Sequence, residues 1–181
     1  IKTERNFIVF DIKGKNVLIT GATSGIGRAA ALSLSNMGAN ISFIARNSEK
    51  ADKLCKEIFD NTDKRPNSII ADMSSQEDIK KATNHLLDRG IKNVIITLGD
   101  KGAYFANKSE SFTVNAFDVA DRVVDTTGAG DAFNAGLAVA LTEGKGIKKA
   151  IQFANAVGGL SATKIGTAKS MPLRSEIDNF L

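Results

Sequence analysis

A short apolar run that leads into a glycine-rich turn and a helical pattern constrains the fold of this chain most. Residues 16–19 (Asn-Val-Leu-Ile) are typical of a buried strand, and a second strand is expected at residues 40–45. A strand, a helix and a second strand in this order predict a βαβ unit and a parallel sheet. In the turn, Gly21 would permit the tight reversal, Gly25 the close approach of a pyrophosphate, and Gly27 close helix–strand packing. The alternative is a glycine-rich turn that serves packing alone.

A second glycine-rich stretch precedes another apolar helix. Residues 125–131 read Asp-Thr-Thr-Gly-Ala-Gly-Asp. The backbone N–H groups of three small residues could converge there on an anion, aided by the helix dipole: Gly128, Ala129 and Gly130. Asp131 would lie in the first turn, where its carboxylate could take a proton from a hydroxyl that attacks a phosphoryl group. Alternatively, Thr127 only caps the helix and Asp131 only complements its dipole.

Composition excludes several classes of protein. The 181 residues are 43% hydrophobic, which is enough for one core, and we expect a single domain, a monomer more readily than an oligomer. The net charge of +4 is spread along the chain, which argues against nucleic-acid binding. One cysteine, Cys55, excludes an internal disulfide, and one histidine, His85, gives no zinc constellation. With no apolar run of membrane-spanning length and no targeting signal, we expect a cytoplasmic protein.

These patterns predict an α/β fold, a single-domain doubly wound (Rossmann-like) three-layer sandwich over residues 1–181. Parallel strands in the order 3-2-1-4 would be extended by an antiparallel hairpin, with residues 1–80 and 81–181 as two halves of one core. Residues 7–10 could add a short edge strand. Strands one and four are expected at 16–20 and 93–98, and the hairpin strands at 103–107 and 111–116. The helices are expected at 26–37, 49–60, 76–89, 130–143, 147–163 and 173–181.

The glycine-rich turn and the strands beside it resemble the short-chain dehydrogenase/reductase family over about residues 13–75. The resemblance implies a dinucleotide site made by Gly21, Ser24, Gly25, Ile26, Gly27, Arg46 and Asp72. Because Arg46 follows the second strand where an acid would bind a ribose 2′-hydroxyl, NADP is favoured as the cofactor, although Arg46 could equally be an ordinary surface residue. Asp72 could bind the adenine amino group or cap the helix that begins near Gln76.

The catalytic residues of the short-chain dehydrogenases are missing from this chain. Residues 97–99 (Thr-Leu-Gly) replace the Asn-Ala-Gly turn of that family, and its catalytic serine is absent. Tyr104 precedes Lys108 at the family's spacing, but residues 102–107 are typical of a strand. On a strand, two residues four apart are separated by roughly 13 Å, whereas on a helix they are neighbours. Hydride transfer by Tyr104 and Lys108 is therefore not expected.

The remainder of the chain, about residues 86–181, resembles the ribokinase family of sugar and nucleoside kinases. The motifs are residues 94–102, the stretch 125–131, Phe153-Ala154-Asn155-Ala156, and residues 164–168. The resemblance implies that Asp131 is the base and that phosphates of ATP or ADP bind at Gly128, Ala129 and Gly130. It also implies that Thr97, Gly99, Gly102 and Asn155 hold the nucleoside. Mg²⁺ would accompany ATP, and a monovalent cation would bind at Asp125, Thr127, Gly166 and Ser170.

Each half of the chain lacks the part that would complete its catalytic site. The ribokinase family's sugar pocket, lid and Asn-x-x-Glu motif have no counterpart before residue 86, where the dehydrogenase-like segment stands. We therefore expect an engineered or recombinant chimera, joined between residues 75 and 86, that binds a nucleotide, phosphate or sulfate without efficient catalysis. Two alternatives are a ribokinase-like ATP-dependent phosphotransferase fragment that uses Asp131, and an NADP-binding reductase relative without its Tyr/Lys pair. A protein in which neither site is occupied is a further alternative.

Overall fold

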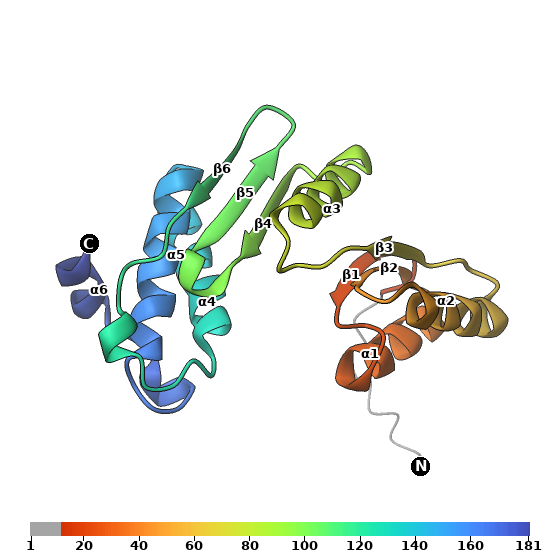
Figure 1. The fold of residues 1–181 in the computed structure, drawn as a ribbon, viewed down its shortest axis with the longest axis horizontal. Helices are drawn as coiled ribbons and strands as arrows, with labels where there is room; N and C mark the ends of the chain where they lie inside the picture. The colour runs from red at the N-terminus through yellow and green to blue at the C-terminus, as the bar shows by residue number, and fades with distance from the viewer. Residues whose placement is uncertain (1–11) are drawn as a thin grey trace, which may run out of the picture. The chain divides into compact units, whose positions relative to one another are not determined.

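The computed structural model describes residues 12–181 and divides the chain into two compact units (Figure 1). The units are residues 1–85 and 86–181, and the division falls within helix α3 (Gln76–Asp88). The edge strand considered for residues 7–10 lies outside the described residues. The single core shared by both halves stays a prediction, and each unit is described by itself below.

The first unit contains a parallel sheet and helices. Its elements are β1 (Asn16–Thr20), α1 (Gly25–Asn36), β2 (Asn40–Ala45), α2 (Ser48–Thr62) and β3 (Asn67–Ile70). The strand order is β1-β2-β3, so β2 is central, and its Phe43 is fully buried. Phe43 belongs to one core cluster with Leu54 and Ile58 of α2, which lie on the apolar face of that amphipathic helix. The helix begins where Asn47 accepts a hydrogen bond from the Lys50 N–H (2.9 Å).

The second unit contains an antiparallel sheet followed by helices. Its elements are β4 (Asn93–Thr97), η1 (Gly99–Lys101), β5 (Ala103–Asn107), β6 (Ser111–Val114), η2 (Ala120–Arg122), α4 (Ala129–Thr142), α5 (Ile147–Ala162), η3 (Ala168–Ser170) and α6 (Arg174–Phe180). The strand order is β4-β5-β6, and Phe105 of β5 pairs with Ile95 and Phe112 on either side.

Helices α4 and α5 cover this antiparallel sheet and hold the second core. Phe105 is fully buried and packs in one cluster with Phe133 of α4 and Ile151 of α5. The two helices approach closely because Gly136 has no side chain: a Cβ there would lie 2.8 Å from Val157 Cγ2. This packing fixes the beginning of α4 relative to α5 and to the end of β4, where the cavity described below is found.

The expected α/β class is confirmed, and so are the order of the first three strands and the hairpin after β4. Within each unit the strands form one three-stranded sheet. The expected order 3-2-1-4 would also pair β1 with β4, and this pairing, which would join the two units, stays a prediction. The pairing partner of β4 is β5, which follows it after one short turn. Tyr104 lies in β5 and pairs with Ile96, so it does not share a helix with Lys108, as expected.

Candidate functional site

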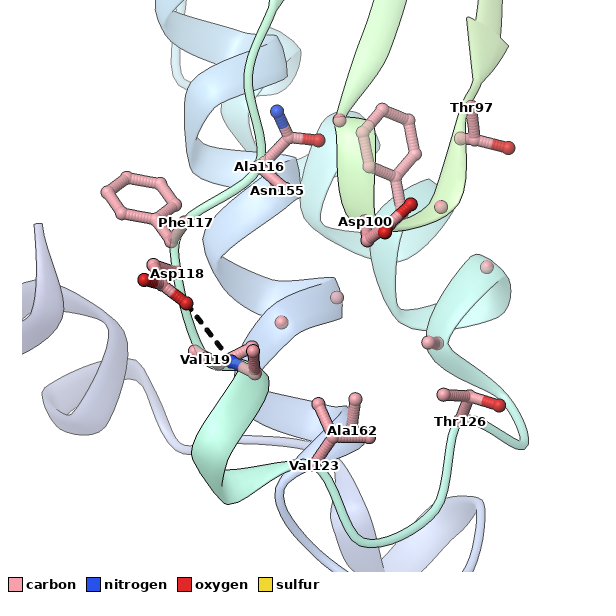
Figure 2. A pocket seen from close by; sticks show the side chains of 18 residues that line it. Thr97, Asp100, Ala116, Phe117, Asp118, Val119, Val123, Thr126, Asn155 and Ala162 are labelled. Atoms are coloured by element: carbon pink, nitrogen blue, oxygen red, sulfur yellow. Dashed lines mark hydrogen bonds between the residues drawn. The ribbon is translucent and has the colours of Figure 1, made fainter.

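A cavity of about 620 Å³ opens in the second unit (Figure 2). The loop after β4 forms one side and residues 116–123 form another, while the first turn of α4 and the last turns of α5 complete it. The sequence predictions bear on six of its lining residues: Thr97, Gly99, Gly102, Ala129, Gly130 and Asn155. The structure therefore brings together three motifs that are widely separated in the sequence.

The first turn of α4 carries unpaired backbone donors, and one of their residues, Gly130, lines this cavity. Gly128 is the N-cap residue, and its φ of 82° lies in the left-handed region that favours glycine. The Ala129 N–H donates to the Thr126 carbonyl (3.2 Å) and the Ala132 N–H to the Gly128 carbonyl (2.9 Å). Within residues 12–181, the N–H groups of Gly128, Gly130 and Asp131 have no acceptor. Such a turn at a helix N-terminus suits an anion.

Gly130 leaves the space in front of these donors open. A Cβ at this position would meet no atom within 4 Å, although Gly130 lines the cavity. Asp131 follows in the first turn of α4 and is exposed, and its side chain makes no hydrogen bond or ion pair with another residue of the described part. Its carboxylate is therefore free to accept a proton beside the donors of the turn.

Asp125 ties two loops together next to α4. Its carboxylate accepts hydrogen bonds from the Thr127 N–H (2.9 Å) and the Gly166 N–H (3.0 Å). Hydrogen bonds from Thr127, first through its side chain and then through its backbone, and from the Gly166 N–H hold the pKa of Asp125 below the ordinary value. Asp125 thus joins the segment just before α4 to the loop after α5.

The four residues expected to hold a monovalent cation are partly joined by these contacts. Asp125 bonds Thr127 and Gly166, while the buried Ser170 donates its hydroxyl to the Thr167 carbonyl (2.7 Å). Among residues 12–181 there is no cluster of three or more His, Cys, Asp or Glu side chains that could hold a metal ion. A cation here would therefore depend on backbone and hydroxyl oxygens together with one carboxylate.

The opposite side of the cavity is built around the end of β6. Gly102 has a φ of 91°, and a Cβ there would lie only 2.1 Å from the Val114 carbonyl oxygen. Asn155 of α5 approaches the same place and donates to the carbonyls of Val114 and Asn115, each at 3.0 Å. Gly102 and Asn155 thus fix the position of residues 114 and 115, at the end of β6, from which the chain continues into the cavity wall.

The wall itself was not among the residues expected from the sequence. Residues 116–120 line the cavity, and Asp118 accepts a hydrogen bond from the Ala120 N–H (3.2 Å) (Figure 2). Gly158 and Gly159 of α5 face this wall and the start of α4. Glycine inside a helix weakens the helix, so a pair of glycines there indicates that packing requires them. The Gly158-Gly159 pair was therefore the sequence signal that other segments pack closely against α5 at this point.

In the first unit, the turn between β1 and α1 has the geometry that its glycines predict. Gly21 and Gly25 have positive φ values of 66° and 51°. A Cβ on Gly27 would lie 2.4 Å from the Gly21 carbonyl oxygen, so only glycine allows this close packing. Ser24 is the N-cap of α1 without a capping side-chain hydrogen bond, and Ile26 is 91% exposed.

The other residues expected at a dinucleotide site have local roles. Arg46 is exposed, as the surface alternative predicts. Asp72 accepts hydrogen bonds from the backbone and hydroxyl of Ser74 (2.9 and 2.8 Å), which lower its pKa, with a smaller effect of Arg46. Asp78, rather than Asp72, reaches back across the start of α3 and accepts from the Asp72 N–H (2.7 Å). Asp72 therefore closes a turn before that helix.

The fold and the cavity together define an α/β protein in which a helix N-terminus with unpaired backbone donors lies beside a cavity large enough for a small ligand. The model of the pfkB family of carbohydrate kinases matches residues 13–174, and the chain belongs to this family. No helix among residues 12–181 combines the length and the apolar character that a membrane span needs.

Relatives with known names support the same assignment. The chain is 39% identical over 110 residues to a ribokinase of Haemophilus influenzae. The aligned residues make up 61% of this chain and 35% of that protein. It is similar to the solved structure of Arabidopsis thaliana ribokinase complexed with ribose and ATP (26% identity, TM-score 0.56, 91% and 55% of the two chains). It is also similar to the solved structure of a candidate ribokinase II of Escherichia coli in complex with ATP and Mg²⁺. The identity is 25% and the TM-score 0.56, and the match covers 92% of this chain and 58% of that chain. The chain spans about a third of the length of the Haemophilus relative.

These comparisons correct the main functional expectation from the sequence. A single family model covers the dehydrogenase-like segment as well as the kinase-like segment, so the chimeric scaffold without efficient catalysis is wrong as an account of function. The relatives favour the kinase alternative, and they support ATP while giving no support to NADP.

Proposed function

We propose that this chain provides the nucleotide site and the proton acceptor of a ribokinase-like, ATP-dependent phosphotransferase that acts on a hydroxyl group of a sugar. The observation that supports this most is the cavity at the first turn of α4, where the N–H groups of Gly128, Gly130 and Asp131 lack acceptors within residues 12–181 and Asp131 also supplies a carboxylate. The membership of the pfkB family and the ATP complexes of its relatives agree with it.

The phosphates of ATP would lie at the α4 terminus and the nucleoside between the loop after β4 and residues 116–123. Backbone N–H groups at Gly128, Gly130 and Asp131 would stabilise the negative charge of the transferred phosphoryl group. Mg²⁺ would enter with the nucleotide and neutralise part of the phosphate charge. A monovalent cation at Asp125, Thr127, Gly166 and Ser170 would add positive charge beside the same turn.

Asp131 would act as the base of the transfer. The oxygen of the acceptor hydroxyl attacks the γ-phosphorus, the bond from that phosphorus to the β,γ-bridging oxygen breaks, and ADP leaves. The hydroxyl proton passes to the Asp131 carboxylate. The exposure of Asp131 and its lack of partners within residues 12–181 allow it to reach such a hydroxyl.

The test is the substitution Asp131→Asn, followed by a measurement of ADP formation with ribose and a panel of other sugars. An amide cannot accept the proton, so we expect the transfer rate to fall about 10²- to 10⁴-fold while ATP affinity stays within a small factor. Asp60→Asn, the same change at an exposed residue of α2 that does not line the cavity, should leave the rate unchanged. Equal rates for Asp131→Asn and the unmodified chain, or no sugar-dependent ADP formation at all, would contradict the proposal.

A further inference from the structure

The cavity wall formed by residues 116–123 is not paired with a strand or a helix. Within the described part of the chain, no hydrogen bond joins it to another element, and the N–H groups of Arg122 and Val123 donate to carbonyls inside the wall (2.8 and 3.4 Å). The chain is fixed on either side of the wall, by Asn155 at the end of β6 and by the Val124 N–H, which donates to the end of α5 (2.9 Å). Between these two points, the position of the wall depends on side-chain contacts.

Helix α6 supplies two of these contacts through Phe180. The ring centroids of Phe180 and Phe117 lie 5.0 Å apart, with the ring planes tilted by 53°. The guanidinium carbon of Arg122 lies 5.6 Å from the centroid of the Phe180 ring. Both are attractive geometries. Phe117 lines the cavity, and its ring points away from Thr97 and Asp100 on the other side (Figure 2).

Phe180 can hold the wall because α6 is itself anchored to the helices behind it. Ile177, one turn before Phe180, is 6% exposed and belongs to a core cluster with residues of α4 and α5. Arg174 forms an ion pair with Glu143 in the turn between α4 and α5. Its guanidinium carbon also lies 5.3 Å from the centroid of the Phe153 ring of α5. The contacts of Phe180 therefore join the wall to the packed core of this unit.

We infer that α6 is a brace that holds the cavity wall in place, and that Phe180 is a positioning residue for a ligand bound in the cavity. Phe180 does not line the cavity, so it acts through Phe117 and Arg122. Its effect on a ligand rests on the proposed function, in which the nucleoside lies against the wall. Without the Phe180 ring the wall has more freedom, and a ligand that touches it must bear the cost of ordering it.

Amide hydrogen exchange tests the brace in the absence of any ligand. In Phe180→Ala, the amides of Arg122 and Val123 should exchange about tenfold faster, because their hydrogen bonds lie inside the wall and open with it. The amides of β5 should keep their rates. The matched control is Leu181→Ala, which removes an exposed apolar side chain beside Phe180 and should leave exchange in the wall unchanged.

Two further variants separate the ring contacts from general stability. Phe180→Leu keeps most of the apolar volume but has no ring, so it should also speed exchange in the wall, even if Phe180→Ala does not fold. Phe180→Tyr keeps the ring and should preserve slow exchange. An unchanged rate in the wall of Phe180→Leu would overturn the inference, and so would a rate that rises to the same extent in β5.

Calorimetry with Mg–ATP and with inorganic tripolyphosphate tests the consequence for binding. The dissociation constant of Mg–ATP should rise about threefold to tenfold in Phe180→Leu, because its nucleoside would meet a less ordered wall. That of tripolyphosphate should stay unchanged, because the donors for phosphate lie at the start of α4. Equal weakening of both ligands, or no weakening of Mg–ATP, would contradict the positioning role. Binding of neither ligand by the unmodified chain would defeat the proposed function, while hydrogen exchange still decides whether α6 braces the wall.

Discussion

At the scale of single residues, Asp125 shows how one side chain prepares the anion-binding turn. Its two carboxylate oxygens accept separate backbone N–H groups, one from Thr127 just before α4 and one from Gly166 after α5. Across this link, Gly128 lies against Thr167, whose Cγ2 would be 3.3 Å from a Cβ at Gly128. Asp125 therefore holds the loop that delivers Gly128 to its left-handed conformation.

This contact predicts a pH dependence of stability. Because hydrogen bonds from Thr127 and Gly166 lower the pKa of Asp125 in the folded chain, its contribution is full above the ordinary pKa of about 4 and is lost as the pH falls through the lowered value. Asn has one acceptor oxygen and does not titrate. The free energy of unfolding of Asp125→Asn should therefore lie below that of the unmodified chain at pH 7, and the gap should narrow below about pH 4.

Urea unfolding at a series of pH values between 7 and 3 measures this gap. The matched control is Asp60→Asn, since the Asp60 side chain is exposed and has no hydrogen bond or ion pair within the described residues. Its gap to the unmodified chain should be small at every pH. A gap for Asp125→Asn that stays constant down to pH 3 would show that the carboxylate is not stabilised in its charged form.

Residue roles were predictable where they depend on neighbours in the sequence. The conformations of Gly21 and Gly25 and the close packing of Gly27 follow from local turn geometry. The alternative in which Thr127 caps α4 is wrong, because the N-cap residue is Gly128. The role of Asn155 was not predictable in this way. Its two hydrogen bonds reach residues about forty positions away, and they become visible only when α5 packs beside the end of β6.

At the scale of elements, the close contact of α4 and α5 supports the cavity. Small residues meet along this contact, with Gly136 of α4 against Val157 and Ala154 of α5. The two helices also enclose Phe133 and Ile151, which bury their side chains against β5. Because α4 begins at the anion-binding turn, its spacing from α5 sets the width of the cavity between Gly130 and Gly158.

Gly136→Val should destabilise the protein by overpacking this contact. The new Cβ would lie 2.8 Å from Val157 Cγ2 and 3.2 Å from the Ala154 Cα, and the backbone atom cannot move aside without shifting α5. We expect a loss of about 1–3 kcal/mol in the free energy of unfolding, measured by urea denaturation. Ala135→Val introduces the same residue at the neighbouring exposed position of α4 and should cost much less. Equal losses in the two variants would contradict close packing at Gly136.

Most elements were predictable because their hydrophobic periodicity and end signals are local. The expected helices at 130–143 and 147–163 differ from α4 and α5 by one residue at most. The strands and the hairpin follow from short apolar runs bounded by turn residues. The β1–β4 pairing stays a prediction, because strand neighbours distant in sequence are set by tertiary contacts, which a periodic pattern does not encode.

At the scale of the whole molecule, one family model matches both the segment that resembles the dehydrogenases and the segment that resembles the ribokinases. The model of the pfkB carbohydrate kinases matches residues 13–174, which include parts of both compact units. The glycine-rich turn of the first unit does not by itself define a function, because parallel α/β folds of unrelated function use the same glycines for strand–helix packing. The cavity of the second unit agrees with the family assignment, since it joins the residues that the kinase motifs indicate.

The most direct test of this account is a titration of the isotope-labelled chain with Mg–ATP, followed through its backbone amide resonances. The account predicts the largest shifts at Gly128, Gly130 and Asp131, whose N–H groups lack acceptors within residues 12–181, and further shifts along residues 116–120. Shifts confined to the turn from Gly21 to Gly27, or no shifts at millimolar Mg–ATP, would contradict the placement of the nucleotide in the cavity beside α4.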